Sequence, residues 1–248
     1  MAEPAPPGFG DVAPFVLEHA WSAPGRGGYW YGLSLPDLAA LASTCRGLRQ
    51  AVDTFAGRQT ALDSRRFQDY QRQSHGDWRG LRPNPRWWMR KRLYVALEWV
   101  SRKMPALRAL DLTQTEGDPK LMFLDDRGLA AVATLAHLEN LTLSNSASRT
   151  HEITTGGVAK VIQRCPLVEL HLAFAFHPAG LNFDQICWLL GNNCSTTLKV
   201  LGINGTLFED EDDDDFGITA TGFGQLKRLR LERLVVWAND GTPCNVQL

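Results

Sequence analysis

The chain has 248 residues, of which 44% are hydrophobic and 21% are charged, so it can bury most of the surface that its unfolded form exposes. No window approaches eighteen consecutive apolar residues, and we therefore expect no membrane-spanning segment. The net charge of −1 is unevenly distributed: residues 46–108 hold fifteen basic and five acidic residues, whereas residues 109–248 hold ten basic and eighteen acidic ones.

The amino-terminal residues 1–28 are rich in proline and glycine and lack the pattern of a secretory or mitochondrial targeting segment. We expect a flexible or degenerate segment there. The five cysteines are an odd number without a C-x-x-C pair, which fits neither a disulfide framework nor a zinc site. They predict reduced thiols, no bound metal, and a cytoplasmic or nuclear protein.

The first predicted helical stretch covers residues 35–52 and is amphipathic, with Pro36 near its start. Its Asp37-Leu38 step, its alanine-leucine helix and the sequence Thr44-Cys45-Arg46 resemble the second half of an F-box. That motif attaches substrate receptors to the adaptor of cullin-type ubiquitin ligases. The first half departs from the family, because the usual Leu-Pro opening is missing and the glycine-rich insert 25–28 interrupts it.

The resemblance implies an F-box-like helical module over residues 29–64 that binds the ligase adaptor through an apolar helix face. The residues predicted to contact the adaptor are Leu35, Pro36, Leu38 and Leu41. Leu35 and Pro36 lie nearest the helix start, so we expect them to be the least involved in the chain's own core and the most suitable as interface anchors.

Residues 65–104 are predicted to form a basic aromatic linker and a capping helix. The spacing of Leu93, Leu97 and Val100 indicates a helix over residues 90–103. The preceding segment interleaves arginine with tryptophan, which would suit contact with a phosphate backbone and stacking on bases. Alternatively, the tryptophans cover the end of the following domain while the arginines face solvent. The residues concerned are Arg79, Arg82, Arg86, Trp87, Trp88 and Arg90.

Residues 105–248 contain an internal repeat. The pattern L-x-x-L-x-[LIV] occurs five times, at intervals of 31, 29, 31 and 33 residues, which leave room for one helix in each unit. The alternation of leucine with other residues predicts a short strand at each copy. The copies start at Leu107, Leu138, Leu167, Leu198 and Leu231.

A second pattern precedes each of the last four copies at a matching place. It presents a side-chain oxygen that can accept a hydrogen bond from the free amides at a helix start, followed by apolar residues three and four apart. The predicted helix caps are Asp125, Thr154, Asn182 and Thr219. The two coupled patterns predict an α/β solenoid of short parallel strands with outer helices. A leucine-rich helical bundle is the alternative, but a bundle needs no strand after each cap.

These repeats resemble the cysteine-containing, ribonuclease-inhibitor-like class of leucine-rich repeats over residues 90–239. Cys165 and Cys194 lie at or near that family's cysteine position before the strand. The ninth motif position departs from the family's Asn or Cys, and only Asn239 retains it. The resemblance implies a solenoid whose strands line a concave face.

On that face, the third, fifth and seventh motif positions should point outward, since side chains alternate across a strand. Its candidate partner-binding residues are Asp111, Asn140, Thr142, Glu169, His171, Asn204, Arg233 and Trp237. His171 beside Glu169 could suggest catalysis. However, no motif supplies a serine or cysteine nucleophile, and a surface histidine is the better interpretation.

Seven consecutive acidic residues occupy positions 209–215 and could dock on a basic partner, although such runs are usually solvated loops. Cys187 and Cys194 have no companion histidines, so we interpret both as packing residues. No phosphate-binding loop, nucleophile elbow, zinc-protease motif or dinucleotide fingerprint is present in the sequence. We therefore expect a binding protein without catalytic residues or cofactor.

Two functions fit these features. The first is an F-box-like leucine-rich-repeat substrate receptor of a cullin-type ubiquitin ligase, with protein partners at both the helical module and the concave face. The second is a structural leucine-rich-repeat subunit of a large assembly, such as a ribonucleoprotein, in which the arginine-tryptophan segment contacts RNA or a neighbouring subunit.

Overall fold

The structure, a computed structural model, describes residues 17–18, 35–63, 85–114, 124–145, 153–174, 180–204, 218–237 and 243–247. Within these ranges the strands form one sheet in the order β1-β2-β3-β4-β5-β6-β7. The first six strands are mutually parallel, and β7 is antiparallel to β6. The strands are β1 (Ala61–Leu62), β2 (Ala109–Gln114), β3 (Asn140–Asn145), β4 (Glu169–Phe174), β5 (Val200–Asn204), β6 (Arg233–Trp237) and β7 (Pro243–Gln247).

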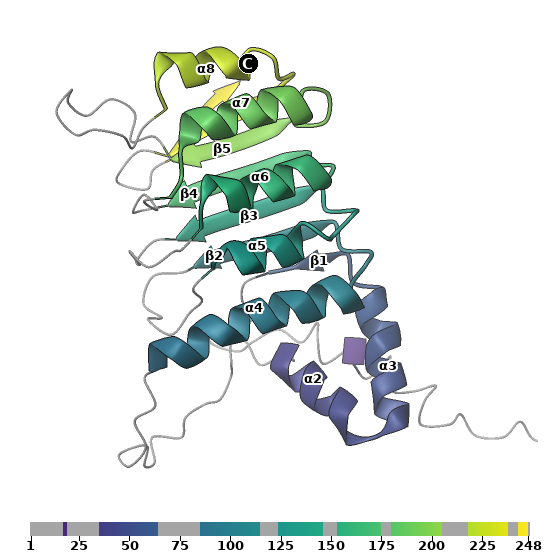
Figure 1. The fold of residues 1–248 in the computed structure, drawn as a ribbon. Coiled ribbons are helices and arrows are strands. Elements are labelled where there is room, and N and C mark those ends of the chain that lie inside the picture. Colours follow the sequence, from purple (N-terminus) through teal and green to yellow (C-terminus); the bar gives the residue numbers. More distant parts are fainter. Residues whose placement is uncertain are drawn as a thin grey trace, which may run out of the picture.

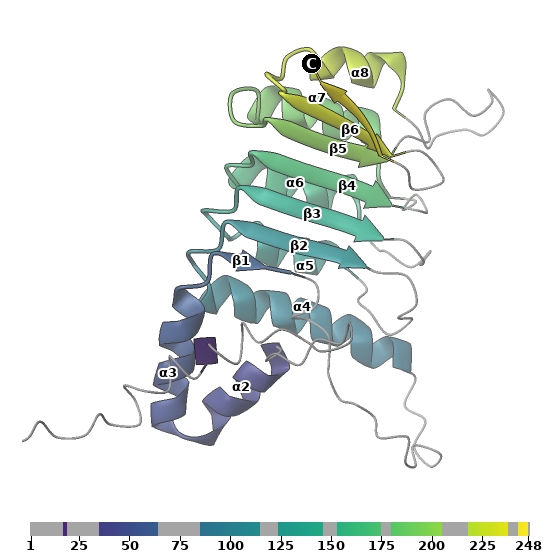
Figure 2. The same ribbon diagram turned by 180° about the vertical axis from the view of Figure 1, so that it is seen from behind.

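The helices from α4 onward form a layer on one face of this sheet, and the opposite views in Figures 1 and 2 show no described helix on the other face. Helices α2 and α3 pack together at the β1 end. This α/β arrangement of successive strand–helix units is compatible with a solenoid. The helices are α2 (Leu35–Thr44), α3 (Arg46–Gly57), α4 (Pro85–Lys103), α5 (Asp126–Val132), α6 (Thr155–Arg164), α7 (Phe183–Asn193) and α8 (Ala220–Leu226).

The leucines of the repeat form rows across the sheet, which confirms the five predicted strands and their phase. The fourth motif residues pair directly from strand to strand, and each is at most 7% exposed. Burying one such side chain stabilises the fold by about 1.5–3 kcal/mol. The row consists of Leu110, Leu141, Leu170, Leu201 and Leu234.

A backbone ladder fixes the register at the amino-terminal ends of the strands. The carbonyl of Arg108 accepts hydrogen bonds from the amides of both Glu139 and Asn140, each at 2.8 Å. The carbonyls of Glu139, Val168 and Lys199 do the same for the strands that follow them. The carbonyl of Thr60, just before β1, accepts from the amides of Arg108 and Ala109 in the same way. By this backbone pattern β1 is an additional copy of the repeat, which the sequence did not reveal.

All four predicted helix caps are confirmed. Asp125 Oδ1 accepts from the Gly128 amide at 2.9 Å, and Asn182 Oδ1 accepts from the Gln185 amide at 2.8 Å. The hydroxyls of Thr154 and Thr219 accept from amides in their own first helical turns in the same way. Each helix therefore begins where a side-chain oxygen satisfies an amide that has no partner within the helix.

Neighbouring helix starts are also tied to each other. The Asp126 carboxylate accepts from the amide and the hydroxyl of Thr154, at 2.8 and 2.7 Å. A Cβ atom at Gly157 would overlap this carboxylate. Asp184 binds Thr219 in the same manner, and Gly222 leaves the corresponding space. Glycine is thus required where the carboxylate of one repeat crosses the helix of the next.

One hydrophobic core runs through the described chain, from Leu35 of α2 and Phe55 of α3 to Leu234 of β6 at the far end of the sheet. Helix α4 is longer than the expected residues 90–103, because it begins at Pro85. No helix among the described residues is both long and apolar enough to cross a membrane.

Candidate protein-binding surface

The sheet face opposite the helices, here called the open face, gathers most of the predicted partner-binding residues. The strand register places Asn140 beside Glu169, and Thr142 between Asp111 and His171. Arg233 continues the row of Glu169 across β5. Asn204 and Trp237 pair in register on β5 and β6, but their side chains lie outside the described ones.

Two outward positions differ from the expectation. Val235 is only 5% exposed, and Gly202 beside it is buried as well. The unexpected strand β7 pairs with β6 and places Asn245 next to Val235. Strand β6 therefore has neighbours on both sides and is not the edge of the sheet. The open face is accordingly more closed at β5 and β6 than the repeat pattern predicts.

A polar group spans the middle of the open face. His171 Nε2 lies 2.6 Å from Glu169 Oε1, which fits a hydrogen bond from the ring to the carboxylate. The same oxygen accepts from an Arg233 guanidinium nitrogen at 3.4 Å. The contact between Glu169 and Arg233 therefore links β4 to β6 across Val200 of β5. The His171 side chain is 13% exposed and that of Arg233 50% exposed, so the histidine is more enclosed than expected and the arginine is available to solvent.

Asp111 is engaged within its own strand, because its Oδ1 accepts from the amide of Thr113 at 2.8 Å and from its hydroxyl at 2.5 Å. The face therefore presents side chains that are already held in place before any partner arrives. Pre-organised groups lose less conformational entropy on binding than free ones. Among the described residues, no group of three or more His, Cys, Asp or Glu side chains could hold a metal ion.

The predicted adaptor-binding residues on α2 are only partly accessible. Leu35 is 3% exposed and Leu38 is fully buried. The expectation that Leu35 lies outside the core is wrong, because α2 packs on α3 and Leu35 faces the shared interior. Leu41 is half-buried at the margin of that core. Pro36 belongs to α2, but its side chain lies outside the described ones.

The predicted nucleic-acid contacts stay untested. Arg79 and Arg82 lie outside the described residues, and Trp87, Trp88 and Arg90, with Arg86, fall in the first turns of α4, where the side chains are not among those described. The choice between contact with RNA and coverage of the domain end therefore stays open.

The cysteines on the repeats are packing residues. The thiols of Cys165 and Cys194 point at the carbonyls of Val132 and Ile162 in the preceding repeat, at 3.8 and 3.7 Å. Burial raises the pKa of both thiols to about 11, and that of Cys187 to about 12.

Cys45 is different, because it is exposed and its sulfur caps α3 by accepting from the Leu48 amide at 3.5 Å. The sequence analysis did not identify this capping role. Cysteine is an uncommon cap, and the sequence analysis expected one helical stretch over residues 35–52, whereas the structure divides it at Cys45 into α2 and α3.

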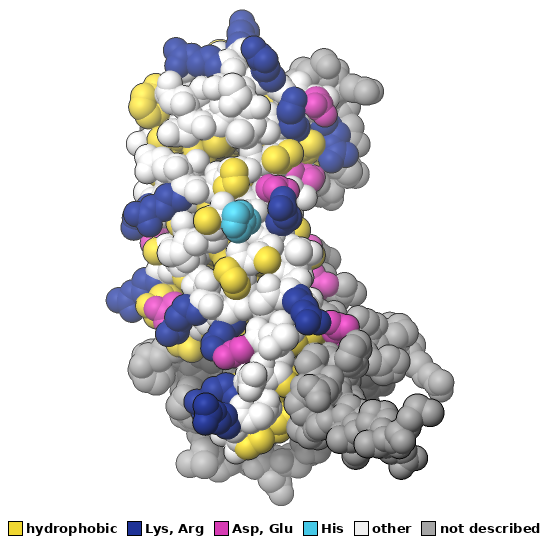
Figure 3. Space-filling model, turned by 90° about the vertical axis from the view of Figure 1, so that its right-hand side faces the viewer, with side chains coloured by type: hydrophobic (Ala, Val, Ile, Leu, Met, Phe, Trp, Pro, Cys, Tyr) yellow, Lys and Arg dark blue, Asp and Glu magenta, His cyan; other side chains and the backbone are white. Residues whose placement is uncertain are grey.

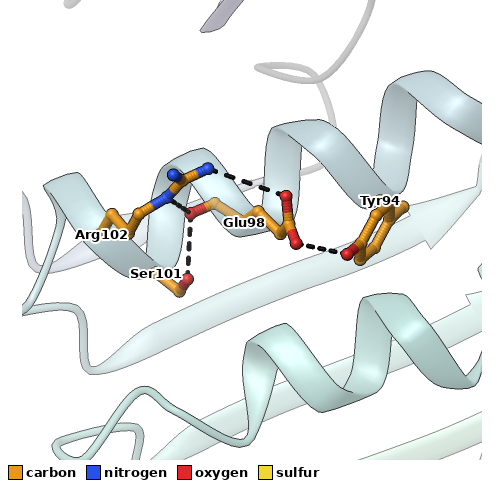
Figure 4. A network of polar contacts seen from close by, with 4 residues as sticks. All are labelled: Tyr94, Glu98, Ser101 and Arg102. Carbon is orange, nitrogen blue, oxygen red and sulfur yellow. Dashed lines mark hydrogen bonds and ion pairs between the residues drawn. The ribbon is translucent and has the colours of Figure 1, made fainter.

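The outer surface of α4 carries a polar network that no motif predicted (Figure 4). The Tyr94 hydroxyl donates to the Glu98 carboxylate, which also pairs with Arg102 at 3.7 Å. The hydrogen bond to Glu98 is the main reason that the pKa of Tyr94 is raised. Two large apolar side chains, Val95 on α4 and Trp188 on α7, are more than half exposed on the outer helices.

No protein-family model matches the chain, and a search of curated proteins finds no match either. The fold and the open face therefore define a class by geometry alone: an α/β protein whose sheet has six parallel strands and one antiparallel strand, with one face that the described helices leave uncovered.

Proposed function

We propose that this protein is a non-catalytic leucine-rich-repeat binding protein of the cytoplasm or nucleus, which holds a protein partner on its open face. One observation carries the proposal: the strands β2 to β6 share one register, and the side chains between the buried leucines line up on a face that no described helix covers. Such a surface is extended and rigid, which suits a macromolecule better than a small molecule.

The polar group at the middle of this face supports a specific partner. Glu169 is held by both His171 and Arg233, and the arginine keeps part of its surface in contact with solvent. An arginine that is anchored by a carboxylate can still donate from its other nitrogens to a partner's acceptor. Arginine is also enriched among the residues that contribute most to protein interfaces.

We further propose that α2 and α3 act as the F-box-like attachment to a ligase adaptor. Their packing on the core at the β1 end supports this proposal, because neither helix covers the open face, where a substrate would bind. Leu35 and Leu38 would hold the module together, and the half-buried Leu41 and Leu48 would offer apolar surface to the adaptor.

Photo-cross-linking tests the open face. A photo-reactive amino acid in place of Thr142 should capture a partner from cell extract, whereas the same group in place of the exposed Lys160 on α6 serves as the matched control. Mass spectrometry of the captured protein then identifies it. Equal capture at both positions would contradict a partner on the open face.

Binding to the purified ligase adaptor tests the attachment. Leu41→Asp with Leu48→Asp should abolish binding while the circular dichroism spectrum stays native, because both side chains are only partly buried. Leu35→Asp is unsuitable for this purpose, since a charge in the core would unfold the module. If the unmodified protein shows no affinity for the adaptor at tens of micromolar, the ligase proposal fails.

The alternative function is a structural subunit of a large assembly, such as a ribonucleoprotein. The exposed Val95 and Trp188 favour it, because a neighbouring subunit could cover them. Co-purification with the subunits of one stable complex, in place of an adaptor and a cullin, would support this alternative.

A further inference from the structure

Three consecutive helix-to-strand turns form a basic edge on one side of the molecule. The turns cover residues 164–168, 194–199 and 227–232 and contain five cations but one acid, which leaves four net positive charges. All five cations are exposed or half-exposed. Figure 3, which views this side, shows several Lys and Arg side chains at the α8 end, among others along the side. The basic edge consists of Arg164, Lys199, Lys227, Arg228 and Arg230.

Contacts among the described residues neutralise little of this charge. Lys199 pairs with Glu232 at 3.0 Å, and Arg228 donates to the Asn192 side chain at 3.1 Å. Across the residues that the structure describes, no ion pair joins Arg164, Lys227 or Arg230 to an acid. The turns nearer α4 are different, because there Arg108 pairs with Glu139 and Lys103 with Asp53. The excess positive charge is therefore a property of the three last turns.

The same chain carries a run of the opposite charge between β5 and α8 in the sequence. Strand β5 ends at Asn204 and the cap of α8 is Thr219, so residues 209–215 belong to a strand-to-helix connection. All seven are acidic. In a parallel sheet every such connection leaves from the carboxyl ends of the strands, and the basic edge is at the amino ends, one strand length of about 17 Å away.

We propose that the acidic run 209–215 of one copy binds the basic edge of a second copy, so that the molecules associate head to tail. This self-association goes beyond the proposed partner-binding function and does not depend on it. Because the two surfaces differ, the contact does not close on itself, and a bound pair still has one free basic edge and one free acidic run. The attraction joins exposed charges, so salt should weaken it.

Sedimentation velocity tests the proposal directly. At low ionic strength the average mass should rise with protein concentration beyond that of a dimer. Addition of about 0.5 M NaCl, where the Debye length falls to only a few ångströms, should return the protein to a monomer. A protein that stays monomeric at about 100 µM in low salt would overturn the proposal, since weak specific contacts are populated at such concentrations.

Two variants separate the two surfaces. Lys227→Glu with Arg230→Glu removes the basic edge, and replacement of residues 209–215 by the matching amides removes the acidic run. Each variant alone should be monomeric. Mixed together, they should form a one-to-one dimer and nothing larger, because each retains one intact surface. The matched control, Arg127→Glu with Lys160→Glu on the outer helices, should associate like the unmodified protein.

Other outcomes refute the proposal. Association that persists without the acidic run would mean that another surface holds the copies together. If the basic edge binds heparin while the protein remains monomeric, the edge recognises a separate polyanion. Failure of the mixed variants to form a dimer, with both natively folded by circular dichroism, would show that the two surfaces do not meet.

Discussion

Leu141 and Thr142 are adjacent in β3 but face opposite sides of the sheet. Leu141 is 1% exposed between the neighbouring leucines of the row, whereas Thr142 is half-buried on the open face. We expect Leu141→Ala to reduce the free energy of unfolding by about 2–5 kcal/mol, because the closely packed interior cannot collapse into the cavity. Thr142→Ala should cost less than about 0.5 kcal/mol. Urea unfolding measures both, and equal losses would contradict the strand phase.

Gly157 provides a second contrast at the scale of single residues. A methyl group there would displace the Asp126 carboxylate that binds Thr154. Gly157→Ala should therefore destabilise the protein by about 1–3 kcal/mol, the usual cost of a lost charged hydrogen bond. Gly224→Ala is the control, since its Cβ would meet nothing within 4 Å, and alanine favours a helix by up to about 1 kcal/mol. Thermal unfolding should shift in opposite directions for the two variants.

The helices and strands differ in how well the sequence predicted them. The four helix caps and five strands were predicted, because a local hydrogen-bonding rule and a period-two pattern determine each of them. Strand β1 was missed because it has two residues and Gln59 in place of the first motif leucine. Strand β7 was missed because an antiparallel return carries no repeat signature.

The burial of Leu35 and the polar contacts of the open face could not be predicted either. An amphipathic helix shows which residues share a face, but its packing partner decides which face is buried, and α3 turns Leu35 inward. The sequence placed Glu169, His171 and Arg233 on the same face. The bond between Glu169 and Arg233 depends on strands that are 64 residues apart and on a register that only the fold supplies.

The connection between β5 and α8 should be replaceable without loss of structure. Exchange of residues 210–215 for a Gly/Ser linker of equal length removes repulsion between like charges. The melting temperature should therefore stay nearly the same or rise slightly. Differential scanning calorimetry at low and high salt measures it. A cooperative loss of structure would show that a basic surface of the same molecule clamps the acidic run.

The single continuous core gives the whole molecule a predictable response to alkali. The thiols of Cys165, Cys187 and Cys194 have a pKa of about 11 to 12 in the fold, against 9.0 for an unburied thiol. Since the native state keeps its protons at higher pH than the unfolded state, these groups contribute stability below about pH 9 and lose it as the pH rises towards 11.

Urea unfolding between pH 8 and 11 should therefore show a falling free energy of unfolding. The free energy of unfolding of the Cys187→Ala variant should fall less steeply than that of the unmodified protein. Lysines and tyrosines titrate in both proteins, so their contribution cancels when the two slopes are compared. An identical slope in the two proteins would mean that Cys187 is ionised equally in both states. At neutral pH, a thiol reagent should modify the exposed Cys45 before Cys165, Cys187 and Cys194.

The carbonyl ladder at the amino-terminal ends of the strands has a consequence for how this protein can vary. Each carbonyl there accepts two amides of the next strand, so the backbone of these turns is held without help from the side chain it carries. The equivalent positions Arg108, Glu139, Val168 and Lys199 hold a cation, an anion, an apolar group and again a cation. Single substitutions at these positions can therefore change the charge of the edge formed by the helix-to-strand turns, while the geometry of the sheet stays the same.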